Sequence, residues 1–197
     1  MIKAIAFDLG GVVTSTDFDA LYASFAERIG LTIEAFRSVY HKDFDGMLTG
    51  KMDLKDLWSE LQKVGGRKNL DYRSVWIEEA SKSRTVNTEL LDYIANLRKT
   101  YKVGALTNLT PTRNVLDEEI DLYSHFDFTV LSFKEKCKKP DPKIYELALE
   151  RAGAKPEEML FIDDREEMTA GADKVGIKTI VYKDNRQLFS DISSFLR

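Results

Sequence analysis

The feature that most constrains the fold is a short apolar run near the start of the chain, Ile2–Phe7, which ends directly on Asp8. A run in which apolar and polar residues do not alternate is typical of a strand that is buried on both faces, as in a parallel sheet. Gly10 and Gly11 follow, and glycine favours the end of a strand because it adopts backbone angles that other residues resist. In parallel sheets ligands bind beyond the carboxyl ends of the strands, so Asp8 is predicted to lie where chemistry occurs. The alternative is that Asp8 only caps the next turn.

The segment after this strand has helical spacing. Its apolar residues recur every three or four positions, which predicts helices. They cover 18–29, 33–40, 54–64 and 71–83. Asp43–Gly46 is predicted to be a turn because it combines two aspartates with a glycine. Asp17–Ser83 is therefore predicted to be an all-helical insert that lies over the carboxyl edge of the sheet.

From Asn87 onward helices and strands alternate regularly. The predicted helices are 88–99, 112–121, 142–152, 167–175 and 186–196, and the predicted strands are 103–106, 128–131, 159–162 and 178–181. Such alternation predicts right-handed crossovers and a parallel sheet with helices on both faces. The fold class is therefore α/β, a Rossmann-like doubly wound parallel sheet with an inserted all-helical cap. Residues 1–15 and 85–197 are predicted to form the core, and residues 16–84 the cap.

Composition narrows the function classes. The 197 residues carry 29 Lys and Arg against 33 Asp and Glu, a net charge of −4, which gives no broad basic surface for nucleic acid or an anionic membrane. Cys137 is the single cysteine, so no internal disulfide and no zinc cluster is predicted. No run approaches the roughly 18 apolar residues of a membrane span. A cytoplasmic protein is expected, and its oligomeric state is not readable from the sequence.

Polar side chains follow several of the predicted strands. Asp8 follows the first strand, Thr107-Asn108 follows 103–106, and Asp163-Asp164 follows 159–162, while Lys139 precedes the helix that begins near Pro142. The ends of parallel strands meet at one edge, so these groups are expected to converge. Converging carboxylates repel one another unless a cation shares them, and Mg²⁺ prefers such oxygen ligands.

Each of these groups also has a simpler interpretation. Asp163-Asp164 could cap a helix, and Thr107-Asn108 could form a plain turn. Lys139 lies in a lysine-rich run, 134–139, of the kind that usually forms a solvated surface. The Pro-Asp-Pro sequence that follows distinguishes Lys139 from its neighbours.

Together, four ordered motifs resemble those of the haloacid dehalogenase-like hydrolase superfamily. They are Phe7-Asp8-Leu9-Gly10-Gly11-Val12, Leu106-Thr107-Asn108, Lys139-Pro140-Asp141-Pro142 and Phe161-Ile162-Asp163-Asp164. The resemblance extends over the whole chain, including the helical cap after the first motif. It implies a Mg²⁺-dependent phosphatase of a small phosphorylated metabolite, with a sugar phosphate as the first expectation.

The resemblance also implies a role for each matching residue. Asp8 would be the nucleophile, forming an aspartyl-phosphate, and would bind Mg²⁺ together with the carbonyl of Gly10 and with Asp164. Asp163 would orient metal-bound water. The phosphate would be bound by Thr107, Asn108 and Lys139.

Two positions depart from the family pattern. The residue two after the nucleophile is normally a second aspartate that protonates the leaving alcohol, and here it is Gly10. General acid–base catalysis contributes about 10²–10⁴ in rate, so its absence bears on turnover. The second departure is Met168, where related sequences often carry an amide or an acid.

These departures leave two alternatives open. The chain could be a catalytically weak phosphate-binding or regulatory protein, for which Gly10 is the reason. It could also be a metal-independent haloacid-type dehalogenase, against which the intact Asp163-Asp164 pair argues.

Overall fold

The computed structural model describes residues 1–196, and its centre is a parallel sheet in the order β5-β4-β1-β6-β7. The strands are β1 (Ala4–Phe7), β4 (Lys102–Thr107), β5 (Phe128–Leu131), β6 (Met159–Asp163) and β7 (Lys178–Val181). Every neighbouring pair is parallel. The predicted α/β fold with a parallel, doubly wound sheet is confirmed.

The first strand, β1, lies in the middle of the sheet. It pairs with β4 on one side, Ala4 opposite Lys102, and with β6 on the other, Ala4 opposite Met159. All four of its residues are fully buried. A central strand covered on both faces has no wet side, which explains the continuous apolar run in the sequence.

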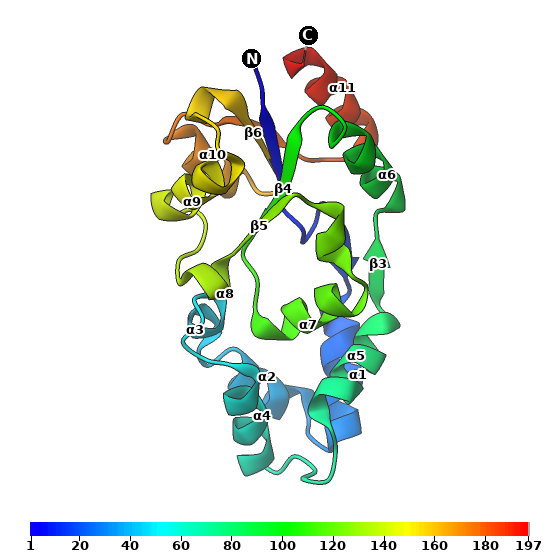
Figure 1. The fold of residues 1–197 in the computed structure, drawn as a ribbon. Coiled ribbons are helices and arrows are strands. Elements are labelled where there is room, and N and C mark those ends of the chain that lie inside the picture. The colour runs from blue at the N-terminus through cyan, green and yellow to red at the C-terminus, as the bar shows by residue number, and fades with distance from the viewer. Residues whose placement is uncertain (197) are drawn as a thin grey trace.

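Helices cover both faces of the sheet (Figure 1). Apolar residues of α6 (Thr88–Leu97) and α11 (Asn185–Phe195) pack with β1 in one core cluster. Apolar residues of α9 (Pro142–Ala152) and α10 (Glu166–Asp173) pack in a second cluster on the other face. The sheet is therefore the middle of three layers, and its strands all point toward the same edge.

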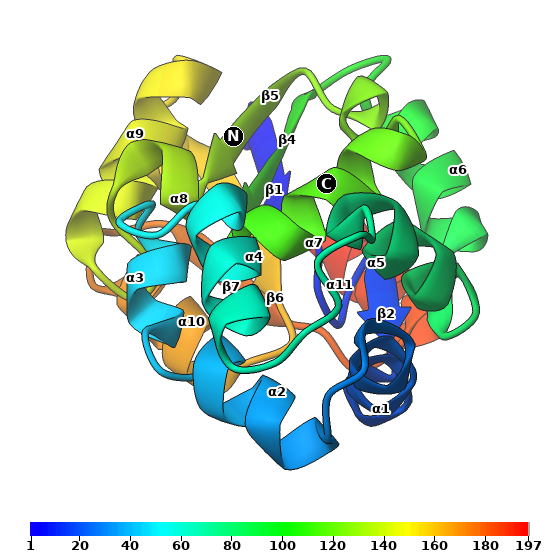
Figure 2. The same cartoon turned by 90° about the horizontal axis from the view of Figure 1, so that it is seen from below.

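The insert forms a helical unit beyond the carboxyl edge of the sheet (Figures 1 and 2). It consists of α1 (Phe18–Ile29), α2 (Ile33–Tyr40), α3 (Phe44–Leu48), α4 (Leu54–Lys63) and α5 (Tyr72–Ser81). Its interior is aromatic: the ring of Trp76 lies 5.0 Å from that of Phe25 and 6.0 Å from that of Tyr40, measured between centroids. Such ring pairs add to the stabilisation that burial provides.

Helix α7 (Pro111–Glu119) joins the helical unit to the sheet. Its residues Val115 and Leu116 belong to the aromatic core cluster of the insert. Thr112 is held from the insert twice, because its hydroxyl bonds to that of Tyr40 at 2.9 Å and its carbonyl accepts from the indole N–H of Trp76 at 2.9 Å. The division into residues 1–15 with 85–197 and residues 16–84 stays a prediction, and Arg197 lies outside the described residues.

A short two-stranded ribbon, not predicted from the sequence, joins the two ends of the insert. Strand β2 (Thr14–Thr16) pairs antiparallel with β3 (Arg84–Val86), Thr14 opposite Val86 and Thr16 opposite Arg84. Each strand has only three residues, mostly polar, and is too short for an alternation pattern to be recognised. The ribbon brings together the two points where the chain enters and leaves the insert.

The predicted turn at Asp43–Gly46 is wrong, because a short helix, α3, begins there. The side chain of Asp43 caps it by accepting a hydrogen bond from the Gly46 N–H at 2.9 Å. The same aspartate that favours turns also favours helix N-termini, so the composition could not separate the two. Three further short elements were not predicted: η1 (Leu122–His125), α8 (Ser132–Glu135) and η2 (Pro156–Glu158). Within residues 1–196, every helix is too short or too polar to cross a bilayer.

Candidate active site

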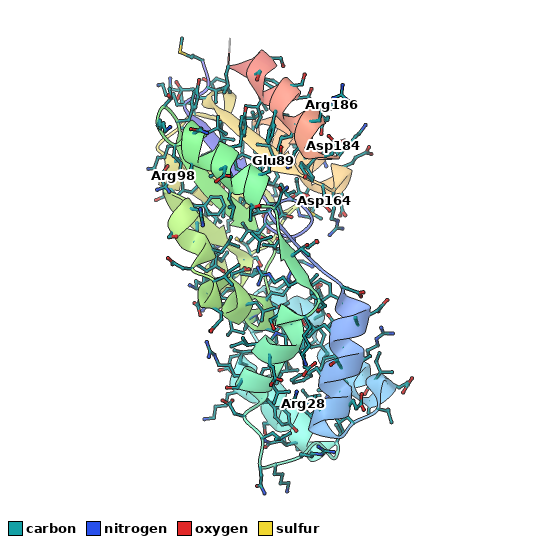
Figure 3. The ribbon with its side chains drawn as sticks, turned by 90° about the vertical axis from the view of Figure 1, so that its right-hand side faces the viewer. Arg28, Glu89, Arg98, Asp164, Asp184 and Arg186 are labelled. Atoms are coloured by element: carbon teal, nitrogen blue, oxygen red, sulfur yellow. The ribbon has the colours of Figure 1, made fainter. Side chains whose placement is uncertain are left out.

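A cleft of about 280 Å³ opens at the carboxyl edge of the sheet, where β1, β4 and β6 end. Its walls include Asp8, Thr107, Lys139 and Asp164. Figure 3 labels Asp164 in the α/β part of the molecule, and the helical unit lies below it in this view. The groups that the sequence placed at separate strand ends therefore line one cavity.

Asp8 presents one oxygen to the protein and the other to the cleft. Its Oδ1 accepts a hydrogen bond from the Leu9 N–H at 2.8 Å and lies 3.1 Å from the ammonium nitrogen of Lys139. Among residues 1–196 no donor contacts its Oδ2. The carboxylate is thus fixed in orientation by Oδ1, and Oδ2 is available to a ligand or to an electrophile.

The turn after Asp8 requires glycine at position 11. Gly11 has φ +84°, in the left-handed region, and a Cβ built on it would overlap the carboxylate of Asp164. The backbone donors of this turn bond to the carbonyls of Leu9 and Thr14, and none of them bonds to the Gly10 carbonyl. That carbonyl is therefore available as a ligand beside Asp8.

Lys139 is a buried cation between two carboxylates. Its side chain is about 1% exposed, and its Nζ lies 2.5 Å from Asp163 Oδ2 and 3.1 Å from Asp8 Oδ1. The same nitrogen donates to the carbonyl of Leu106 at 3.0 Å. These acceptors hold the ammonium group between the carboxylates, where it offsets part of the negative charge of the cleft.

Asn108 holds the backbone of Lys139. Its amide nitrogen donates to the Lys139 carbonyl at 2.9 Å, and its amide oxygen accepts from the Lys139 N–H at 2.8 Å. Both ends of the amide are engaged, so the side chain of Asn108 positions the lysine. Its predicted contact with phosphate stays a prediction, to be made by another part of the residue.

The three carboxylates form a cluster suited to a metal ion. Oxygens of Asp8, Asp163 and Asp164 lie within 4.8 Å of one another. Burial raises the pKa of Asp163 to about 6, Lys139 opposes the rise, and Asp8 adds to it. Burial, and then Asp8, also raises the pKa of Asp164. One ammonium cannot balance three carboxylates, so this donor set fits a hard divalent cation such as Mg²⁺.

The remaining predicted residues also lie at the cleft. Thr107 ends β4 and is 1% exposed, and it lines the cavity. Met168 lies in α10, buried, and lines the same cavity. The structure thus brings all the predicted side chains to one place, while the roles assigned to them stay predictions.

Arg113 is one of several cleft residues that the sequence did not predict as part of the site. Arg113, in α7, lines the cleft and faces Gly10, because a Cβ built on Gly10 would overlap its terminal nitrogen Nη2. An arginine on a helix carries no motif, so its own position gave no signal. The available signal was Gly10, since a missing side chain leaves volume that a well-packed protein fills from elsewhere.

The chain is similar in sequence to known hydrolases. A family model described as haloacid dehalogenase-like hydrolase matches residues 2–176. A D-ribitol-5-phosphate phosphatase from Bacteroides thetaiotaomicron is 30% identical over 176 residues, which cover 83% of this chain and 84% of the relative. A phosphorylated carbohydrates phosphatase from Thermotoga maritima is 27% identical over 190 residues, covering 91% and 84% respectively.

A solved structure has a similar fold over almost the full length. It is the magnesium complex of a haloacid dehalogenase family enzyme from Bacteroides thetaiotaomicron, with a TM-score of 0.77 and 26% identity. The match covers 95% of this chain and 98% of that one. The sheet and the helical insert are therefore both parts of a known architecture.

Proposed function

This chain belongs to the haloacid dehalogenase-like hydrolase family, which confirms the resemblance noted in its motifs, and from that premise we propose that it is a Mg²⁺-dependent phosphatase of a small sugar phosphate. The observation that carries the proposal is the cleft in which the carboxylates of Asp8, Asp163 and Asp164 lie together, with the buried Lys139 holding Asp8 by Oδ1 and leaving Oδ2 free. Such a site binds a dianionic phosphoryl group through cations and presents a nucleophile to it.

Asp8 is the proposed nucleophile. Its Oδ2 attacks phosphorus, the bond between phosphorus and the ester oxygen breaks, and that oxygen leaves with the electron pair. Water then attacks the phosphorus of the aspartyl-phosphate, one of its protons passes to the departing phosphate, and the carboxylate of Asp8 is regenerated. Lys139 holds Asp8 Oδ1 throughout, which aims Oδ2 at the cleft.

The other cleft residues bind and orient the phosphoryl group. Thr107 donates its hydroxyl to a phosphate oxygen, and the ammonium of Lys139 offsets the shared charge of nucleophile and phosphate. Asp8, the Gly10 carbonyl and Asp164 would hold Mg²⁺, with Asp163 orienting its water. Bound Mg²⁺ supplies positive charge that the carboxylates and the phosphoryl oxygens share.

A sugar phosphate suits the second cavity, which adjoins the cleft inside the helical unit. It encloses about 560 Å³ and shares Phe18 and Arg113 with the cleft. Tyr22, Tyr40 and His41 contribute rings to its wall, and Asp19 and Arg37 contribute charges. Rings stack on the C–H faces of a polyol while charged groups bond to its hydroxyls. The relatives named above act on ribitol 5-phosphate and on phosphorylated carbohydrates.

The test is the release of inorganic phosphate from a panel of sugar and polyol phosphates, ribitol 5-phosphate among them, with Mg²⁺ and with EDTA. We expect turnover that EDTA abolishes. Phosphate binding without turnover of any ester would favour the alternative of a regulatory protein, for which Gly10 remains the reason. Release of halide from a 2-haloacid in EDTA would favour the dehalogenase.

A further inference from the structure

Arg113 occupies the space that a side chain at position 10 would need. A Cβ built on Gly10 would overlap Nη2 of Arg113 and would lie 3.2 Å from its Cζ. The family's usual aspartate at this position protonates the leaving oxygen, so its carboxyl group points at that oxygen. In this chain a guanidinium stands next to the same point of the backbone.

The side chain of Arg113 is held in place without being neutralised. Its Cζ lies 5.3 Å from the centroid of the Phe18 ring, within the range of a cation–π contact. Thr110 caps α7 by accepting from the Arg113 backbone N–H. Among residues 1–196 the guanidinium has no ion pair with a carboxylate and no hydrogen-bond acceptor.

The residue before it, Thr112, is fixed by the two hydrogen bonds from the helical unit described above. Arg113 is therefore a half-buried cation on a rigid helix, and within residues 1–196 it forms no ion pair. A cation left unpaired in a partly desolvated cleft favours negative charge in front of it. Arg113 shares the cleft with the residues proposed to carry out phosphoryl transfer, so a phosphate ester bound there would bring its negative charge into the same cavity.

We propose that Arg113 is a catalytic residue that replaces the missing general acid by charge instead of by a proton. This rests on the proposed phosphatase function. When Asp8 attacks phosphorus, the ester oxygen leaves with the electron pair of the broken bond. The guanidinium donates a hydrogen bond to that oxygen and stabilises its negative charge, and a water molecule then protonates it. Arginine keeps its own proton in proteins, so it acts as a fixed positive charge.

The effect of Arg113 on the rate should depend on the leaving group of the substrate. An acidic leaving group such as 4-nitrophenol departs without help, whereas the hydroxyl of a sugar departs as a strongly basic alkoxide. The benefit of Arg113 must therefore grow with the basicity of the leaving oxygen. A role limited to binding phosphate would benefit all esters equally, because every ester presents the same phosphoryl group.

The experiment compares kcat on ribitol 5-phosphate and on 4-nitrophenyl phosphate for the parent and for Arg113→Gln. We expect Arg113→Gln to lose about 10²–10³ on ribitol 5-phosphate, the usual cost of one preorganised donor, and no more than about fivefold on 4-nitrophenyl phosphate. Arg113→Lys keeps the charge and should retain part of the difference. The matched control is Arg186→Gln, which changes an exposed arginine on α11 (Figure 3) and should leave both rates unchanged.

A second variant tests the same role of Arg113 by restoring the carboxyl group. Gly10→Asp with Arg113→Ala restores the carboxyl group and removes the guanidinium that would pair with it. We expect this protein to recover turnover of ribitol 5-phosphate relative to Arg113→Ala alone, and to show an alkaline fall in kcat that the parent lacks. Gly10→Asp alone should gain nothing, because its carboxylate meets Arg113.

The outcomes separate this proposal from the proposed function. Equal loss on both esters, or a rise in KM with unchanged kcat, would overturn the role of Arg113 and leave the phosphatase intact. Thermal unfolding of each variant identifies a loss that comes from misfolding, and a folded Arg113→Lys that behaves like Arg113→Gln on every ester would also count against a role by charge. A parent that hydrolyses neither ester, nor any in the panel, would overturn both proposals.

Discussion

The cleft and the helical unit are built from opposite kinds of contact. In the cleft, Lys139 lies between the carboxylates of Asp8 and Asp163, so the interior is held by charge. In the helical unit, rings such as those of Phe25 and Trp76 pack on one another, so the interior is held by apolar contact. Crowding like charges costs stability, whereas burying rings provides it. The two regions should therefore respond differently to substitution, one in activity and the other in stability.

The largest expected effect is on activity and comes from the cleft. Asp8→Asn keeps the shape of the side chain but removes the nucleophile, and it should lower kcat by more than about a thousandfold. The free energy of unfolding should change little, because one negative charge leaves a crowded cluster. Phosphate release measures the loss of activity, and denaturant unfolding of the same preparation measures the stability. Substantial residual turnover would mean that Asp8 is not the nucleophile.

The next effect is on stability and comes from the helical unit. Trp76 is fully buried, so Trp76→Ala should cost about 3–5 kcal/mol of the free energy of unfolding, the usual cost of deleting a large buried aromatic side chain. Denaturant unfolding measures it. Trp58→Ala is the control, since Trp58 is only partly buried in the same cluster and should cost less. A Trp76→Ala protein as stable as its parent would contradict the contrast between the two regions.

Mg²⁺ should stabilise the folded protein by offsetting the repulsion between the cleft carboxylates, and the size of this stabilisation should depend on pH. The pKa of Asp163 in the folded protein is about 6, above its ordinary value of 3.8. The folded state therefore binds this proton more tightly, so the metal-free protein loses stability as the pH rises from about 4 through about 6. Saturating Mg²⁺ should add about 2–3 kcal/mol at pH 7.5 and much less at pH 5, where protons compete. Thermal unfolding with Mg²⁺ and with EDTA at both pH values measures this.

An equal effect of Mg²⁺ at the two pH values would show that the ion binds elsewhere. Asp164→Asn supplies the matching control, because it removes a proposed metal ligand while leaving Lys139 and Asp163 paired. Its Mg²⁺-dependent stabilisation should disappear.

The smallest effect concerns the contact that joins the two regions. Tyr40→Phe removes one hydrogen bond, to the hydroxyl of Thr112, and keeps the ring, so it should cost about 1 kcal/mol. The loss stays small because the Thr112 hydroxyl keeps a second partner, the hydroxyl of Thr110, at 2.8 Å. Denaturant unfolding detects it. A cost above about 3 kcal/mol is on the scale of a buried polar group left unsatisfied. It would show that this contact between the two regions contributes more to stability than one hydrogen bond is expected to.

The same contrast explains what could be predicted from the sequence. The buried strands and the polar residues that end them were predictable, because a continuous apolar run followed by Asp8 or Asp163-Asp164 has few structural solutions. Their convergence followed from the parallel sheet. The ribbon of β2 and β3 and the short helix α3 were not predictable, since a three-residue segment or one aspartate-rich tetrad fits several local structures.

Arg113 shows a different limit. Its importance depends on which face of α7 meets Gly10, and that is set by the packing of Val115 and Leu116 into the helical unit. Local sequence patterns do not predict contacts between distant segments such as this one. The glycine at position 10, where the family carries a side chain, is the feature that would have indicated that another residue fills the space.

The central position of β1 also governs the order in which the molecule can be completed during synthesis. Its two neighbours are β4, beginning at Lys102, and β6, beginning at Met159, so the first strand made must wait for most of the chain before the sheet closes around it. The helices of the insert are neighbours in sequence and the ribbon of β2 and β3 ties its two ends together, so much of it can pack sooner, while Val115 and Leu116 of α7 complete its core later. Once tied, it shortens the loop that β1 and β4 must close, which lowers the entropic barrier to pairing them. We therefore expect the helices of the insert to pack on one another before the cleft beneath them is complete.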